Sequence, residues 1–197
     1  EDLEKVLETI RTRPDAISWD QRLTMAKVMM AGVSALHDAG IVHGDLKPPN
    51  IQLFRDASIA AGYRLKLIDM DYSILADRRA PWHGYQGYVG SPNYFSPEHL
   101  IGPAPMPASD VFTCGLILYE LLANRHPYDM EDPDHYREQA LAGRPEYPRL
   151  VGEMPAPATN EDVANVIQHC LAPDPAARPS ARDVNLILNG KMGAEPY

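Results

Sequence analysis

The sequence predicts a single, mainly α domain with a few short strands. The 197 residues are 45 % hydrophobic, which is enough for one well-packed core and short for two. Apolar residues recur at helical spacing in several long segments, whereas residues of β type occur only in short runs. No internal repeat or linker divides the chain, so we treat residues 1–197 as one domain.

The first two helices are predicted from apolar periodicity and from a capping motif. The residues that share one face of the first helix are Leu3, Val6, Leu7 and Ile10. Pro14 ends this pattern. Ser18 and Gln21 form a capping box, in which each side chain can satisfy the other's backbone N–H. The second helix should therefore start after Ser18 and run to about Gly40, which can take the left-handed cap.

Short strands and a long irregular stretch are predicted next. The β-type runs cover residues 41–43, 51–54 and 64–68. Gly, Pro and Asp residues separate them, with a loop at about 55–63. Residues 69–107 are rich in Gly, Pro and Tyr and show no sustained period. A loop of this length in a compact domain is usually functional or disordered.

The second half is predicted to be helical. Residues 111–122 are apolar nearly all round, which indicates a buried helix, with Ser109 or Asp110 placed to cap it. Asn160 and Ser180 are placed to begin two of the later helices. The later helices are expected at about 133–142, 161–171 and 181–188. The Pro-rich stretches between the helices are expected to be turns, at residues 103–107, 145–157 and 173–179.

Charge and composition exclude several classes of function. A formal net charge of −9 argues against a nucleic-acid or anionic-membrane surface, because such a surface needs basic residues to neutralise phosphates. No apolar run approaches the roughly 20 residues needed to cross a bilayer, so we expect no membrane segment in this chain. Cys114 and Cys170 lie far apart and lack metal-ligand spacing. A reducing, cytoplasmic compartment is expected.

The strongest functional motif lies between the first two β-type runs. It reads Ile41-Val42-His43-Gly44-Asp45-Leu46-Lys47-Pro48-Pro49-Asn50. A carboxylate, an ammonium and an amide occur close together, on Asp45, Lys47 and Asn50. Phosphoryl transfer needs a carboxylate to orient the attacking hydroxyl, a cation near the transferred phosphate and oxygen ligands for Mg²⁺. The motif therefore indicates phosphotransferase chemistry.

Residues 43–50 resemble the catalytic loop of protein kinases, His-Arg-Asp-Leu-Lys-Pro-x-Asn. The resemblance implies that Asp45 is the catalytic aspartate, Lys47 contacts the transferring phosphate and Asn50 binds metal. It also implies ATP and Mg²⁺ as the nucleotide and the metal. The lysine two positions after Asp45 favours serine/threonine kinases, since tyrosine kinases typically have Ala-Ala-Arg or Arg-Ala-Ala in that loop.

Two further motifs follow in the order of the kinase family. One β-type run ends at Asp69, where the family has Asp-Phe-Gly, so the resemblance implies that Asp69 is a Mg²⁺ ligand. The family's Gly-Thr-Pro-x-Tyr-x-Ala-Pro-Glu segment resembles Gly90-Ser91-Pro92-Asn93-Tyr94-Phe95-Ser96-Pro97-Glu98. This match closes an activation segment at residues 69–98, which in the family docks the protein substrate. The resemblance implies that Ser91 supports Asp45 and Lys47.

Structural positions of the family also match. Glu98 would form a buried ion pair with Arg178 of Ala177-Arg178-Pro179-Ser180. The run Asp110-Val111-Phe112-x-x-Gly115 resembles the Asp-x-Trp-x-x-Gly opening of the family's central helix. In the family, that aspartate binds the backbone of the catalytic loop. The matches cover essentially the whole chain, so we expect the fold of a protein-kinase-like C-terminal lobe.

The nucleotide-covering parts of the family have no match in residues 1–197. We find no Gly-rich phosphate loop, no Val-Ala-x-Lys strand and no Glu-bearing partner helix, which the family uses to cover ATP and anchor its phosphates. We therefore expect an isolated C-terminal lobe whose missing partner is the N-terminal lobe. Such a chain should bind ATP weakly and be inactive alone.

Two departures leave alternatives open. Gly44 stands where most protein kinases have an arginine that pairs with activation-loop phosphate, and Asp71 replaces the glycine of Asp-Phe-Gly. His-Gly-Asp, with a later Ile-Asp-x-Asp, also resembles aminoglycoside and choline phosphotransferases, which phosphorylate small molecules. A pseudokinase or binding scaffold is a second alternative. Lys47, residues 91–98 and Arg178 favour a kinase that phosphorylates proteins.

Overall fold

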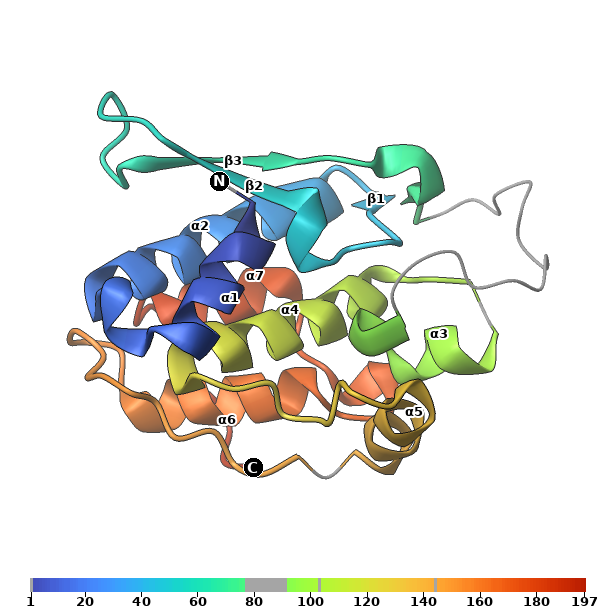
Figure 1. Ribbon diagram of the computed structural model, residues 1–197. Coiled ribbons are helices and arrows are strands. Elements are labelled where there is room, and N and C mark those ends of the chain that lie inside the picture. Colours follow the sequence, from blue (N-terminus) through green and yellow to red (C-terminus); the bar gives the residue numbers. More distant parts are fainter. Residues whose placement is uncertain (1, 77–91, 103, 144) are drawn as a thin grey trace.

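The computed structural model describes residues 2–76, 92–102, 104–143 and 145–197. This part of the chain is mainly helical with a few short strands (Figure 1), which confirms the predicted fold class. Its α-helices are α1 (Leu3–Thr12), α2 (Trp19–Asp38), α3 (Pro97–Ile101), α4 (Pro107–Ala123), α5 (Pro133–Ala142), α6 (Asn160–Cys170) and α7 (Ala181–Leu188).

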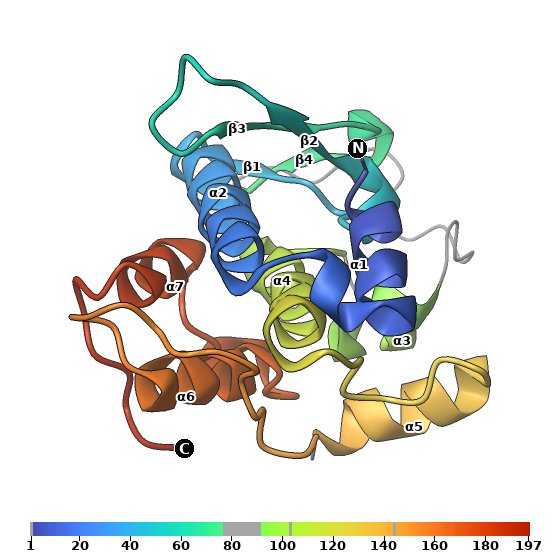
Figure 2. The same cartoon turned by 60° about the vertical axis from the view of Figure 1, so that its left-hand side comes forward.

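Helix α4 forms the centre of the domain. Residues 109–122 of this helix are all buried, as the all-round apolar pattern predicts. Helices α2 and α6 both pack against α4, and Figures 1 and 2 show them above and below it. Phe112 and Tyr119 are among the largest fully buried side chains. The central helix therefore forms the core against which the other helices pack.

Two small antiparallel sheets lie on one side of this helical body (Figures 1 and 2). Their strands are β1 (Ile41–Val42), β2 (Ile51–Arg55), β3 (Tyr63–Leu67) and β4 (Ile74–Leu75). Strand β2 pairs with β3, with Ile51 opposite Leu67. Strand β1 pairs with β4, with Val42 opposite Ile74. Each sheet therefore brings the loop between β1 and β2 next to the segment that follows β3.

The second helix starts as predicted. Ser18 Oγ accepts a hydrogen bond from Gln21 N at 3.3 Å, and Gln21 Oε1 accepts one from Ser18 N at 3.0 Å, which confirms the capping box. After the end of α2, Gly40 has a φ of 74°, as expected for the residue that follows the helix.

The predicted start of one helix is wrong. Helix α4 begins at Pro107, inside a stretch predicted to be a turn, because proline is well tolerated at the first helical position. Met106 is the residue that precedes the helix. Ser109 lies in the first turn, where its Oγ accepts a hydrogen bond from Met106 N at 3.0 Å, and Asp110 lies in the same turn. By contrast, helix α6 begins at Asn160 as predicted, and Thr159 caps it through its Oγ1, which accepts a hydrogen bond from Asp162 N.

The stretch 69–107 contains more regular structure than its lack of period predicts. Strand β4 and helix α3 lie in it, together with 3₁₀ turns at Met70–Tyr72 and Pro92–Tyr94. These elements are too short for a periodic apolar pattern to identify them. Residues 77–91, which include Ser91, lie outside the described part.

Among the helices of the described ranges, none combines the length and the apolar character that crossing a membrane requires.

Candidate active site

The loop between β1 and β2 brings together three of the predicted site residues. Asp45 is buried, and its Oδ2 lies 2.9 Å from Lys47 Nζ. Asn50 Nδ2 donates to the backbone O of Asp45 at 2.9 Å. Pro48 starts a 3₁₀ turn that ends at Asn50, and this turn brings the amide back toward Asp45. The carboxylate, the ammonium and the amide therefore lie in one compact loop.

Asp110, in the first turn of α4, binds the backbone of the same loop. One carboxylate oxygen of Asp110 accepts from His43 N at 2.8 Å, and the other accepts from Gly44 N at 3.1 Å. These bonds confirm the predicted contact of Asp110 with the backbone of the loop at residues 43–50. His37 Nε2, at the end of α2, donates to the same Asp110 side chain at 2.9 Å. Sequence reasoning missed His37, because its partner lies 73 positions away.

The imidazole of His43 connects this loop to the end of β3. Asp45 N donates to His43 Nδ1 at 3.3 Å, and this bond assigns the proton of the ring to Nε2. Nε2 then donates to the backbone O of Ile68 at 3.1 Å. In addition, Ile68 N donates to the backbone O of Asn50 at 3.0 Å. The residue immediately before Asp69 is therefore attached to the loop at two points.

Asp69 is exposed and has an unusual backbone conformation. Its φ and ψ are both 58°, in the left-handed region. No hydrogen bond or ion pair joins its side chain to another residue in the described ranges, so the structure does not link it directly to Asp45. Asp71 lies in the turn that follows and is not among the residues with positive φ. Of the two aspartates Asp69 and Asp71, only Asp69 has a left-handed backbone conformation.

The donor set of this region fits Mg²⁺. Asn50 offers an amide oxygen and Asp69 a carboxylate, and oxygen ligands are what Mg²⁺ prefers. Asp45 Oδ1 is buried and has no hydrogen-bond partner among the described residues, so this acceptor can take a further hydrogen bond. Across the described ranges, no group of three or more His, Cys, Asp and Glu side chains could hold a metal ion by itself. A metal here would depend on few protein ligands plus water and phosphate oxygens.

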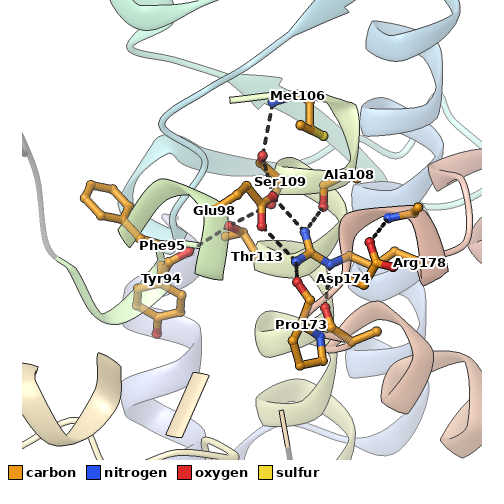
Figure 3. Close-up of polar contacts among 12 residues, drawn as sticks. Tyr94, Phe95, Glu98, Met106, Ala108, Ser109, Thr113, Pro173, Asp174 and Arg178 are labelled. Carbon is orange, nitrogen blue, oxygen red and sulfur yellow. Dashed lines mark hydrogen bonds and ion pairs between the residues drawn. The ribbon is translucent and has the colours of Figure 1, made fainter. Parts of the chain in front are cut away.

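The predicted ion pair between Glu98 and Arg178 is present and buried (Figure 3). Two hydrogen bonds of 2.8 Å join the guanidinium to the two carboxylate oxygens. Burial alone would raise the pKa of Glu98, but the bonds from Arg178 and Ser109 lower this pKa to about 2. Arg178 also donates to the backbone oxygens of Ala108 and Pro173. The pair therefore connects α3 to the start of α4 and to the segment before α7.

A second buried carboxylate, Glu120 of α4, was not predicted to take part in the structure around the site. Tyr94 Oη donates to Glu120 Oε1 at 2.7 Å, and Arg11 Nε donates to Oε2 at 2.9 Å. Burial first, and then the neighbouring Glu120 charge, raise the pKa of Tyr94. This network connects α1, α4 and the end of the predicted activation segment. Ser91, predicted in the same segment, lies outside the described residues.

Comparisons with known proteins agree with these features. A sequence model of the family described as "Protein kinase domain" matches residues 1–186. Calcium/calmodulin-dependent protein kinase type II of Caenorhabditis elegans is 38 % identical over 120 residues, which are 61 % of this chain and 16 % of that protein. The alpha chain of the Drosophila melanogaster enzyme is 32 % identical over 155 residues, 79 % of this chain and 28 % of that protein.

A bacterial relative covers a similar range. Serine/threonine-protein kinase pkn2 of Myxococcus xanthus is 29 % identical over 163 residues, 81 % of this chain and 19 % of that protein. The chain thus spans less than a third of the length of each of these three relatives. Because the family match covers nearly the whole chain, this protein belongs to the protein kinase domain family.

Proposed function

We propose that the chain is the large, C-terminal lobe of a serine/threonine protein kinase, which transfers the γ-phosphate of ATP to hydroxyl groups of protein substrates. The observation that carries this proposal is the buried loop in which Lys47 Nζ lies 2.9 Å from Asp45 Oδ2 while Asp45 Oδ1 has no partner among the described residues. The relative named as a serine/threonine-protein kinase, pkn2 of Myxococcus xanthus, supports the same reaction class.

In the proposed reaction each residue of the loop has one role. The unpartnered Oδ1 of Asp45 accepts a hydrogen bond from the substrate hydroxyl and orients its oxygen toward the γ-phosphorus. Lys47 supplies a positive charge where negative charge develops on the transferred group. Asn50 and Asp69 would hold Mg²⁺, which neutralises charge on the ATP phosphates when bound. Ser91 is proposed to support Asp45 and Lys47.

We further propose that the remaining half of the nucleotide site comes from outside residues 1–197, as an N-terminal lobe. The catalytic loop is residues 43–50 and the activation segment is residues 69–98. This proposal is supported by the lack of a glycine-rich phosphate loop in the sequence. Cys114 and Cys170 are free and buried, which supports a reducing, cytoplasmic compartment.

Phosphate transfer by the full-length protein tests the proposed function. Asp45→Asn should lower turnover by a factor on the order of 10² to 10⁴, the usual contribution of a positioned acid–base group, and should leave the fold intact. Asp20→Asn, a change of the same type at an exposed helical position, is the matched control and should keep wild-type turnover.

The acceptor and the size of the effect decide between the alternatives. Transfer to proteins that depends on Asp45 supports the proposal. Transfer to aminoglycoside or choline hydroxyls instead would identify a small-molecule phosphotransferase. If the wild-type protein transfers no phosphate to any acceptor, it is a binding scaffold. If the turnover of Asp45→Asn stays within a few-fold of that of wild type, Asp45 has no role in the reaction.

A further inference from the structure

His126 lies in the loop between α4 and α5, and its imidazole packs against three tyrosine rings. The centroid of its ring is 5.6 Å from that of Tyr94, and the two rings are perpendicular. It is 6.1 Å from the centroids of Tyr128 and Tyr136. Tyr94 belongs to the turn Pro92–Tyr94 and Tyr136 to α5. The imidazole therefore lies between the end of the predicted activation segment and that helix.

One nitrogen of this imidazole faces both backbone groups of Tyr128. Tyr128 N lies 3.1 Å from His126 Nδ1, and Tyr128 O lies 2.9 Å from the same atom. A ring nitrogen accepts a hydrogen bond when it carries no proton and donates one when it carries a proton. The neutral ring with its proton on Nε2 therefore binds the N–H of Tyr128. The protonated ring releases this group and binds the Tyr128 carbonyl instead.

The surroundings of the ring favour its neutral form. The titratable groups packed around it are Tyr94, Tyr128, Tyr136, Glu120 and Arg11. Burial lowers the pKa of His126, and it outweighs the charge of Glu120, which acts in the opposite direction. Within the described ranges no carboxylate bonds to the imidazole, and Glu120 binds Arg11 and Tyr94. A proton on the ring would thus be a buried charge without a bonded partner of opposite sign.

The same loop and α5 also hold the backbone at the end of the predicted activation segment. Asn93 Nδ2 donates to the backbone O of Met130 at 3.0 Å, and Met130 lies two residues beyond Tyr128. Tyr136 Oη donates to the backbone O of Phe95 at 2.8 Å. The backbone of Tyr128 is therefore connected to Asn93 through Met130, over a few residues of one loop.

We propose that His126 is a positioning residue, which fixes residues 93–95 while its imidazole is neutral and releases them when the ring gains a proton. The proton binds Nδ1, the bond from Tyr128 N to this atom is lost, and a bond from Nδ1 to the Tyr128 carbonyl forms. This exchange moves the loop to which Asn93 is bonded. In the proposed kinase this segment docks the protein substrate, so acid should weaken the binding of that substrate. This consequence rests on the proposed function, whereas the proton-dependent contact does not.

Hydrogen exchange of the full-length protein tests the contact without catalysis. The measured quantity is the protection of the amides of residues 93–96, corrected for the intrinsic effect of pH on exchange. In wild type it should fall by roughly fivefold between about pH 8 and about pH 5, as expected for the loss of one hydrogen bond in the range where histidine titrates. His126→Asn should keep high protection at both pH values, because its amide oxygen accepts from Tyr128 N and does not titrate. His126→Leu should have low protection at both.

His135→Asn is the matched control, because the His135 side chain is 52 % exposed on α5. It should lose protection in acid as wild type does. A wild type without this loss, or the same loss in His126→Asn, would overturn the proposal. If neither variant of His126 folds, the ¹⁵N chemical shifts of the wild-type ring decide. A neutral ring with its proton on Nε2 supports the contact, and one with its proton on Nδ1 overturns it.

The KM of the protein substrate is the second readout and separates substrate docking from local structure. Between the same two pH values this KM should rise by roughly fivefold more in wild type than in His126→Asn, in step with the lost hydrogen bond. The KM of ATP should change equally in both proteins. If the KM of the protein substrate also changes equally, the contact stands and its effect on docking is rejected. Loss of protection in acid in a protein that transfers no phosphate would reject only the proposed function.

Discussion

At the scale of single residues, the backbone of Asp69 distinguishes it from every other carboxylate of the described ranges. Only Asp69 and Asn124 combine a side chain with a positive φ there. Asn124 follows the last turn of α4, where a left-handed residue commonly ends a helix. Asp69 ends no helix, so its conformation costs on the order of 1 kcal/mol without a local benefit. Strain of this kind is concentrated at functional sites, which supports Asp69 as the proposed metal ligand.

The two neighbouring carboxylates should therefore differ in importance. Asp69→Asn should lower Mg²⁺-dependent transfer in the full-length protein by more than the roughly 10–100-fold that changes around metal ligands cost. Asp71→Gly should leave most of the activity, because Asp71 has no positive φ to maintain and lies in the 3₁₀ turn that follows the proposed ligand. Rates over a Mg²⁺ titration compare the two. A greater loss with Asp71→Gly would contradict the assignment.

The sequence predicts the site residues that lie close together along the chain, but not those that meet only after folding. Asp45, Lys47 and Asn50 have a recognisable spacing because one turn of backbone brings them together. His37 and Arg11 find their partners 73 and 109 positions away. Nothing in the local sequence of a helix indicates which distant carboxylate its side chain will meet, so these contacts require the packed structure.

At the scale of elements, the ion pair between Glu98 and Arg178 should dominate the stability of the region that closes the activation segment. Arg178→Ala leaves a buried carboxylate without its cation, which costs about 3–5 kcal/mol in comparable pairs. Arg125→Ala is the matched control, because its partner Glu146 is exposed, and it should cost far less. Urea unfolding of both variants measures the difference. Equal losses would show that the buried pair has no special role.

The same pair should make stability depend on pH in the acid range. The pKa of Glu98 is lowered to about 2 in the folded protein, whereas an unfolded glutamate titrates at about 4.3. The contribution of Glu98 is therefore complete above pH of about 4.3 and is lost as the pH falls toward about 2. Urea midpoints at a series of pH values should show this loss in wild type and a smaller one in Glu98→Gln. If the urea midpoints of wild type and of Glu98→Gln fall equally as the pH is lowered, Glu98 is not the source of the loss of stability in acid.

Element boundaries were predicted less well than the elements themselves, and proline explains part of the error. Helices α3, α4 and α5 begin at Pro97, Pro107 and Pro133. Proline was interpreted as a turn signal around Pro107, although its fixed φ suits the first helical position, where no N–H is needed. By contrast, the start of α2 was predicted correctly, because Ser18 and Gln21 satisfy each other within four residues.

At the scale of the whole molecule, residues 1–197 contain the proposed catalytic groups and lack a glycine-rich phosphate cradle. The 197-residue chain should therefore bind ATP with Mg²⁺ weakly and transfer no phosphate by itself. Calorimetry with the chain and with the full-length protein compares the affinities. Micromolar affinity of the 197-residue chain would contradict this expectation.

The distance along the chain between Glu98 and Arg178 also bears on how long the folded state lasts. The two residues lie 80 positions apart, and α4, α5 and α6 lie between them along the sequence. Contacts that close such long loops gain little until the chain entropy of the loop has been lost, so we expect this bond to form after the folding transition state. Arg178→Ala should then accelerate unfolding much more than it slows refolding, which stopped-flow measurements can separate. The buried pair would thus set the lifetime of the native lobe and leave the speed of its folding nearly unchanged.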